Sequence, residues 1–367
     1  MGACDSSNNF SHTTKYSEYI SSNSSPSLPK VLSLKEKESN LRSKNHKRNI
    51  STEKNNYILP ETIAKREDIT KYYKLSKNIV SYGATSLLYI GENNKKEKFA
   101  VKRIVKSGII KKQKLLIKEA ELCLKLNHKN IIKYYEIYED THFINIVMEL
   151  GDTDLFELII NSPNGIIPDS LAIDLLIQIF EVIDFLHSNN IIHCDIKPEN
   201  FVLKFDKNNK STPIVKLIDF GNARKMKKGD SSLLKNFCGT KEYIAPEIFE
   251  ENGFNEKVDI WAAGILMFNM LTGCDPLNND EDSDYRDNIL YKEINFNLIK
   301  NERLRLLNQK LLERYVSKRI SAKEALEAII NIKKEMITDN IISNINNNKM
   351  MNYMNIITNK ISLLSMS

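Results

Sequence analysis

One stretch constrains this chain more than any other. Residues 193–200 read HCDIKPEN, and DFG follows at residues 219–221, nineteen positions after Asn200. The combination suits phosphoryl transfer, which needs little covalent help but requires an oriented nucleophile and neutralised charge. The groups that could provide both are Asp195, Lys197, Asn200 and Asp219. The order and spacing of these motifs leave little room for accident.

With Ala-Pro-Glu at residues 245–247, these motifs resemble the eukaryotic protein kinase family, whose signature pairs H-R-D-L-x-x-x-N with D-F-G and A-P-E. The resemblance implies an α+β, two-lobed fold with a small β-rich lobe, one regulatory helix and a larger helical lobe. It also implies ATP and Mg²⁺ as cofactors. Asp195 would accept or orient the substrate hydroxyl proton, and Lys197 would contact the γ-phosphate and favour Ser/Thr substrates. Asn200 and Asp219 would hold magnesium.

The family places a lysine in an apolar strand and a glutamate in the following helix. Residues 99–104 read FAVKRI, so Lys102 would grip the α- and β-phosphates. Residues 118–128 show apolar positions at helical spacing, with Glu119 at the family position. Glu121 is the alternative, although it falls on another face of the helix. The other positions that the resemblance assigns to ATP are Val80, Gly83, Leu88, Ala100, Met148, Glu149, Leu150 and Asp154.

Two of these assignments carry a specific role. Met148 would be the gatekeeper of a hinge at residues 148–150, although ordinary core packing satisfies the same pattern. Asp154 would reach the ATP ribose or a basic substrate residue. Asp154 and Glu199 match acidic positions of kinases that favour basic substrates, so we expect a mild preference for basic peptides.

The phosphate loop departs from the family pattern. Residues 80–89 read VSYGATSLLY where G-x-G-x-x-G-x-V is expected, and Gly83 is the one glycine that remains. Ser81 and Ser86 add Cβ atoms where glycine would bend most freely. We therefore expect modest ATP affinity, not its absence.

A second departure is Cys194, which replaces the arginine that commonly pairs with a phosphate on the activation loop. Without that arginine a phosphorylated loop loses its main cationic partner. The resemblance therefore implies activation without loop phosphorylation, although Ser231 and Ser232 stay available. Thr240 matches the threonine that touches the catalytic aspartate, with a simple loop hydroxyl as the alternative. The resemblance assigns scaffold roles to Asp259, which braces the catalytic loop, and to Glu247 with its partner Arg319.

Length and composition predict one catalytic domain with two extensions in these 367 residues. We predict a kinase domain at 68–332, divided into lobes at 68–150 and 151–332. Residues 1–67 are rich in Ser, Asn and Lys and are predicted to be a disordered tether. Residues 333–367 are predicted to be an amphipathic, regulatory-like tail, since apolar residues recur at helical intervals there. They are Met350, Met354, Ile357, Ile361 and Leu364. The tail could pack on the large lobe, inhibit it, or dock into a separate calcium sensor.

The chain begins MGACDS, which satisfies the myristoylation pattern with Gly2 as acceptor. A single myristoyl chain binds membranes marginally, so palmitoylation of Cys4 would supply a second signal. No run of 18 apolar residues and no hydrophobic signal region occurs. The five cysteines show neither metal spacing nor a secretory context. We therefore predict a cytoplasmic protein attached peripherally to the cytosolic face of a membrane.

The entry segment at residues 68–75, the acylation motif and the hinge sequence resemble those of the calcium/calmodulin-dependent protein kinases and of the calcium-dependent protein kinases of plants and protists. The EF-hand loops of the second group are not found after residue 332, so direct calcium binding is not expected. A net charge of +6 is modest, and no nucleic-acid signature occurs. The alternatives to an active, membrane-tethered Ser/Thr kinase are a pseudokinase scaffold and an active kinase whose sequence was truncated.

Overall fold

The computed structural model describes Leu59 and residues 62–82, 86–106, 119–206, 212–226, 234, 239–250, 253–277 and 285–364, with side chains up to residue 345. The acylation sites Gly2 and Cys4 and the loop residue Gly83 lie outside the described residues. The same holds for Ser231 and Ser232.

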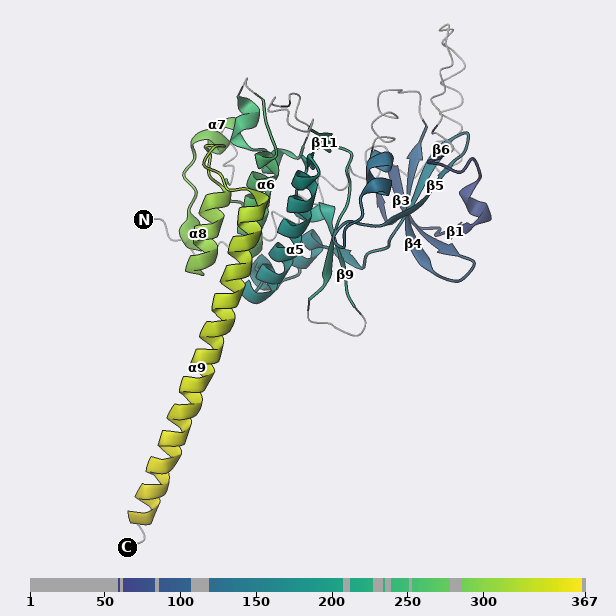
Figure 1. The fold of residues 1–367 in the computed structure, drawn as a ribbon. Helices are drawn as coiled ribbons and strands as arrows, with labels where there is room; N and C mark the ends of the chain where they lie inside the picture. Colours follow the sequence, from purple (N-terminus) through teal and green to yellow (C-terminus); the bar gives the residue numbers. More distant parts are fainter. Residues whose placement is uncertain are drawn as a thin grey trace. The chain divides into compact units, whose positions relative to one another are not determined.

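The first described region is an antiparallel sheet with strand order β1-β3-β4-β6-β5, to which β2 adds by pairing with β3 (Figure 1). Alternating β-branched and aromatic residues favour strands here. The strands are β1 (Tyr73–Leu75), β2 (Ser81–Tyr82), β3 (Ser86–Asn93), β4 (Lys98–Val105), β5 (Tyr134–Glu139) and β6 (Phe143–Met148).

The two faces of this sheet contribute to separate apolar clusters. Ile104 of β4 shares one cluster with Ala120 and Cys123 of the helix at residues 119–125. Val101 shares the other with Tyr73, since neighbouring residues of a strand point to opposite faces. Lys102, two residues before Ile104, is therefore placed on the helix-covered face.

The second region is mostly helical (Figure 1). Its buried centre is formed by α5 and α6, each with nine or more buried residues, so both are apolar on most sides. The helices are α4 (Leu155–Ile160), α5 (Asp169–Ser188), α6 (Lys257–Thr272), α7 (Tyr285–Tyr291), α8 (Glu302–Leu311) and α9 (Ala322–Leu364). Small sheets join β7 (Thr153–Asp154), β9 (Phe201–Lys204) and β10 (Ile214–Leu217), and β8 (Ile191–Ile192) with β11 (Arg224–Lys225).

Short 3-10 helices occupy the turns between these elements. They are η2 (Ile69–Lys71), η3 (Pro163–Gly165), η4 (Pro198–Asn200), η5 (Lys241–Tyr243), η6 (Pro246–Phe249) and η7 (Phe296–Leu298). Two of them matter for the site, because η4 ends the catalytic loop and η5 directly follows Thr240.

The described structure includes Leu59 and residues 62–67, which the sequence assigned to the tether. Leu59 and Ala64 are buried, and the second compact unit of the chain starts at Leu59. Lys65 forms a parallel bridge with Tyr138 of β5. Pairing of Lys65 with the sheet edge satisfies backbone groups of this segment. The polar composition of the segment alone could not reveal that pairing.

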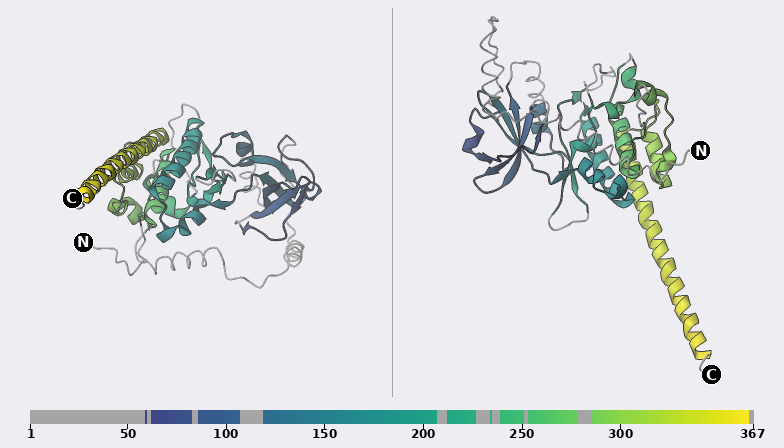
Figure 2. Two further views of the ribbon diagram at one scale, coloured as in Figure 1. Left: turned by 90° about the horizontal axis from the view of Figure 1, so that it is seen from below. Right: turned by 180° about the vertical axis from the view of Figure 1, so that it is seen from behind.

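The predicted boundary between residues 332 and 333 falls inside α9, which is continuous because no glycine or proline interrupts it. Arg303 of α8 bonds to Glu335 and Asp339, and Lys333 bonds to Asp174 of α5. Figure 2 shows the first part of α9 beside α5 and α8 and the remainder running beyond them. Packing on the helical region therefore extends to Asp339.

Farther along α9, three isoleucines are half exposed at four-residue spacing. They are Ile337, Ile341 and Ile345. Docking of a separate calcium sensor to this helix stays a prediction. Across the described residues, no helix has both the length and the apolar character that a membrane crossing requires.

Candidate active site

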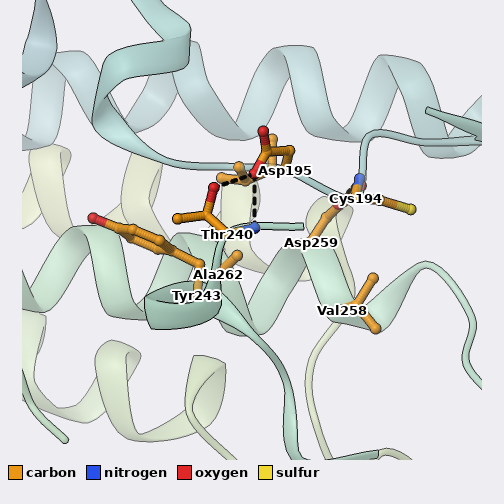
Figure 3. Close-up of a pocket in the computed structure, with 8 residues that line it drawn as sticks. Cys194, Asp195, Thr240, Tyr243, Val258, Asp259 and Ala262 are labelled. Atoms are coloured by element: carbon orange, nitrogen blue, oxygen red, sulfur yellow. Dashed lines mark hydrogen bonds between the residues drawn. The ribbon is translucent and has the colours of Figure 1, made fainter. Parts of the chain in front are cut away.

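The catalytic loop connects β8 to β9 and brings Asp195 against Thr240. The Oδ1 of Asp195 accepts hydrogen bonds from Thr240 Oγ1 at 2.6 Å and from Thr240 N at 3.1 Å, which Figure 3 shows as dashed lines. Thr240 thus has the contact that the resemblance assigned to it. Both bonds go to one oxygen, so Oδ2 is left with longer contacts.

Lys197 and Asn200 complete this cluster. Lys197 Nζ donates to Thr240 Oγ1 at 2.8 Å and lies 3.9 Å from Asp195 Oδ2. Asn200 Nδ2 donates to Asp195 O at 2.7 Å and to Asp195 Oδ2 at 3.2 Å. The structure therefore brings the three predicted catalytic residues together. Lys197 supplies a cation, Asp195 a carboxylate and Asn200 an amide.

Asp259 on α6 holds the loop from below. Its side chain is about 1% exposed, and it accepts hydrogen bonds from His193 N and Cys194 N, both at 2.8 Å. His187 Nε2 lies 2.9 Å from the same carboxylate. These contacts hold Cys194 at φ 64°, a left-handed conformation that non-glycine residues seldom adopt. The strained turn directs Asp195 towards Thr240.

The second scaffold pair also forms. Arg319 binds Glu247 through two bonds of 2.7 and 2.9 Å, and both side chains are buried. Arg319 also donates to Glu313 O and lies 5.2 Å from the ring of Trp261. This bidentate pair joins η6 to the loop before α9, so it fixes the segment that follows Thr240.

Lys102, Glu119 and Asp219 meet at the edge between the sheet and the catalytic loop. Lys102 Nζ lies 2.9 Å from Glu119 Oε1 and 3.6 Å from Asp219 Oδ1. Glu121, the alternative partner, is more exposed than Glu119. Lys102 is thus held between two carboxylates, as a phosphate-gripping lysine requires.

Burial and charge compete in this cluster. Burial alone would lower the pKa of Lys102, but the carboxylates of Glu119 and Asp219 raise it, so the ammonium stays charged. Burial also opposes ionisation of Asp219, yet Lys102 and the amide of Gly221 lower the pKa of that carboxyl. Both groups therefore keep the charges that contact with phosphate and magnesium demands.

The strand register places other predicted ATP residues on one face. Leu88 is opposite Lys102, and Met148 is opposite Ala100. Directly opposed residues share a face, as do alternate residues of one strand, so the side chains of Leu88, Ala100 and Met148 point to the same side as that of Lys102. Val80 precedes β2 and is 55% exposed, and Leu150 follows β6.

Glu149 was predicted to bind ATP, but its carboxylate is already engaged by two lysines. It binds Lys204 at 2.7 Å and Lys216 at 3.1 Å. Burial would raise the pKa of Glu149, but these two lysines hold it below its usual value. Its backbone, not its side chain, is therefore the part left for a nucleotide.

Asp154 is also engaged, since its Oδ1 accepts a hydrogen bond of 2.8 Å from Glu157 N and caps α4. Burial raises the pKa of Asp154 and of Glu199, and the charge of Asp154 adds to the rise at Glu199. A nearby cation would offset both effects, which is compatible with a basic substrate residue at this position.

The residues predicted to hold magnesium suit that ion. Asn200 uses its nitrogen to bind Asp195, which leaves the amide oxygen for a cation. Asp219 is about half exposed and sits at φ 61°. Within the described ranges, no group of three or more His, Cys, Asp or Glu side chains could hold a metal by itself. Mg²⁺ commonly takes one or two protein carboxylates plus phosphates and water, so a two-residue donor set fits.

A small pocket lies beside the catalytic loop, between it, η5 and α6 (Figure 3). Its lining includes the site residues Asp195 and Thr240 and the scaffold residue Asp259. The complete lining is Cys194, Asp195, Ile196, Thr240, Tyr243, Val258, Asp259 and Ala262.

Cys123, on the same helix as Glu119, carries a buried thiol. Burial raises the pKa of this thiol to about 12, so it is inert at neutral pH.

A comparison with known families decides the assignment. The protein kinase domain model matches residues 73–329. The chain belongs to the protein kinase family. Both the family predicted from the HCDIKPEN and DFG motifs and the two-lobed α+β fold are thereby confirmed. Protein kinases use ATP and Mg²⁺ as standard cofactors.

Curated relatives of this kinase are serine/threonine kinases. Myosin light chain kinase A of Dictyostelium discoideum is 32% identical over 267 residues, 71% of this chain and 88% of that protein. Serine/threonine-protein kinase dkf-2 of Caenorhabditis briggsae is 32% identical over 64% of this chain, but the match spans 19% of dkf-2. Human serine/threonine-protein kinase D2 is 34% identical over 60% of this chain and 25% of its own length. The calcium-dependent subgroup stays a prediction.

Sequence reasoning missed several residues that support the site. Lys204 and Lys216 hold Glu149, and His187 supports Asp259. Lys106 and Glu139 form a buried ion pair of 2.6 Å beside β4. No local motif marks these residues, because their partners come from distant parts of the sequence. Charged residues inside otherwise apolar strands were the one available signal.

Proposed function

We propose that this chain is a serine/threonine protein kinase that transfers the γ-phosphoryl group of ATP to protein hydroxyls. The contact of Asp195 with Thr240, Lys197 and Asn200 carries this proposal. The simultaneous presence of the Lys102–Glu119 pair supports it, since a decayed site commonly lacks at least one of these groups.

In the proposed reaction, Asp195 Oδ2 orients the substrate hydroxyl and receives its proton. A bond forms between the oxygen of the substrate hydroxyl and the γ-phosphorus, while the bond from the γ-phosphorus to the bridging oxygen of ADP breaks. Lys197 neutralises charge on the transferred group, and Lys102 holds the departing phosphates. Magnesium held by Asn200 and Asp219 would supply further charge neutralisation when bound.

We also propose that activity does not depend on phosphorylation of the activation loop. Cys194 offers no cation to a phosphate, and Asp259 holds the catalytic loop through its backbone amides instead. The described part of the loop shows Arg224 donating to the carbonyls of Asn222 and Ala223. We therefore propose that the geometry around Asp195 forms without a phosphate on the activation loop.

The proposed activity is tested by incubating the purified chain with labelled ATP, Mg²⁺ and matched basic peptides that differ in one acceptor, Ser, Thr or Tyr. We expect label on Ser and Thr but not Tyr, before and after phosphatase treatment and in calcium or a chelator. Asp195→Asn prepared in parallel excludes a contaminating kinase. No transfer to any peptide would favour the second candidate, a pseudokinase scaffold. The altered phosphate loop and Cys194 are the observations that support this alternative.

A preference for basic substrates belongs to the same proposal. Burial raises the pKa of both Asp154 and Glu199, so an arginine that pairs with them would stabilise their charged forms. A peptide array without enrichment of Arg or Lys before the acceptor would contradict this preference.

We propose that the kinase is held at a cytosolic membrane surface by myristoylation of Gly2 and palmitoylation of Cys4. The motif MGACDS supports this, since one acyl chain alone binds weakly. Intact mass of the protein from its native cell should show the added myristoyl group, and Gly2→Ala should release the protein from sedimented membranes. An unmodified Gly2 would contradict membrane attachment.

A further inference from the structure

The segment that precedes the sheet is built into the small lobe. Leu59 is 1% exposed and Ala64 is 3% exposed. Both belong to the apolar cluster that contains Ile104 of β4 and Ala120 of the 119–125 helix. We call Leu59 and residues 62–67 the lead-in segment. Its buried residues therefore lie on the sheet face that carries Lys102, not on the opposite face with Ile69 and Tyr73.

The lead-in segment extends the sheet at its edge. Lys65 N donates to Ile137 O at 2.9 Å, and Glu139 N donates to Lys65 O at 2.9 Å. Since β5 is the last strand of the order, these bonds satisfy backbone groups that would otherwise face solvent. The side chain of Lys65 adds a partly exposed ion pair with Glu136, which contributes little by itself.

Glu139 connects the lead-in segment to β4. Its side chain is about 3% exposed, and its two oxygens have different partners. Oε2 accepts a hydrogen bond of 3.0 Å from Leu59 N, and Oε1 pairs with Lys106 Nζ at 2.6 Å. Lys106 directly follows β4, four residues after Lys102, and its backbone N donates to His142 O.

A buried carboxylate needs both partners, because loss of Lys106 would leave its charge uncompensated and loss of the Leu59 N–H would leave one oxygen without a hydrogen bond. Removal of Leu59 would therefore disturb Glu139, then Lys106, and with it the end of the strand that carries Lys102. The Lys102–Glu119 pair is the part of the site that this strand and the 119–125 helix hold together.

We propose that the lead-in segment positions the Lys102–Glu119 pair for ATP, with Leu59 and Glu139 as positioning residues. This rests on the proposed kinase function and adds a point of regulation to it. Any partner or surface that draws the lead-in segment away from β5 would loosen the nucleotide site. Neither residue contacts the reacting groups, so they act through β4 and the 119–125 helix.

The test uses full-length variants. Leu59→Asp combined with Ala64→Asp should expel the segment, and we expect the rate of phosphoryl transfer per folded molecule to fall about tenfold. A peptide of residues 56–67 added in excess should recover most of that rate, and the same peptide with Leu59→Asp should not. Glu139→Gln is the milder second variant, which should weaken binding of a fluorescent ATP analogue about threefold.

The matched control is Ile69→Ala, which removes a fully buried side chain from the other sheet face. It should lower the melting temperature while keeping transfer within about twofold of wild type. Equal activity losses in Ile69→Ala and the expelled variant at equal loss of melting temperature would overturn the proposal, as would an unchanged rate in the expelled variant. If wild type transfers no phosphate, the proposed function fails, and analogue binding with peptide rescue still decides whether the segment positions the nucleotide site.

Discussion

The catalytic loop and the Lys102–Glu119 pair are held in different ways. Asp259 fixes the loop with two buried hydrogen bonds and is itself contacted by His187 of α5, and Glu247 with Arg319 fixes the segment behind Thr240. Glu119, in contrast, binds Lys102 through Oε1, while its buried Oε2 has no hydrogen-bond partner among the described residues. The helical region therefore presents a preformed catalytic loop, whereas the nucleotide-gripping pair depends on how the small lobe is packed.

The largest effect is expected at Asp219, which contacts Lys102 of the nucleotide-gripping pair and is one of the two residues proposed to hold magnesium. Asp219→Ala should reduce turnover by about a thousandfold or more, because it removes a carboxylate suited to magnesium and the second partner of Lys102. Its side chain is half exposed, so thermal melting should stay close to wild type. Steady-state kinetics and melting on one preparation check this, and turnover within tenfold of wild type would contradict the assigned role.

The preformed side is tested by Arg319→Met. Glu247 would lose its buried partner, so the free energy of unfolding should fall by about 3–5 kcal/mol. Arg314→Met is the matched control, because Arg314 binds the backbone oxygens of Ile289 and Lys292 instead of a carboxylate. We expect about 1–2 kcal/mol for the control in urea unfolding. Equal losses in both variants would show that the buried ion pair is not special.

The adjustable side is tested by Glu119→Gln. The neutral amide removes a buried charge that is only half satisfied, so stability should be unchanged or rise by about 1 kcal/mol. Turnover should nevertheless fall about tenfold, since Lys102 loses its main anchor. A stability loss as large as that of Arg319→Met would remove the contrast between the two sides.

The smallest effect concerns pH and Glu149 behind the hinge. Its pKa is lowered in the folded chain by Lys204 and Lys216, so its stabilising contribution is present above the unfolded value of about 4.3 and is lost as pH falls through the folded value. Glu149→Gln should therefore reduce stability by about 1 kcal/mol at pH 7, with a smaller difference below about pH 4. Urea unfolding across this range would contradict the assignment if the difference were independent of pH.

The candidate catalytic residues could be predicted from the sequence, because phosphoryl transfer demands particular side chains at fixed spacing. Asp195, Asn200 and Asp219 are recognisable from the loop motifs, and Lys102 from its apolar strand. The family comparison agrees with the fold predicted from them. Such motifs report local chemistry, which is why no tertiary information was required.

Other features depend on distant contacts and could not be predicted in the same way. Leu59 lies in a polar stretch, and its burial follows from pairing with β5, 80 residues away at Glu139. The two lysines that hold Glu149 come from β9 and from β10. The boundary at residue 332 missed the continuity of α9, although the absence of glycine and proline there was a usable signal.

The most direct measurement of the central claim separates binding from chemistry in Asp195→Asn. ATP affinity and single-turnover transfer to a Ser peptide would be measured on the same sample. We predict affinity within about twofold of wild type and transfer reduced about a thousandfold, because Asp195 acts on the hydroxyl and not on the nucleotide. Transfer within tenfold of wild type, with affinity unchanged, would contradict the claim that this carboxylate performs the reaction.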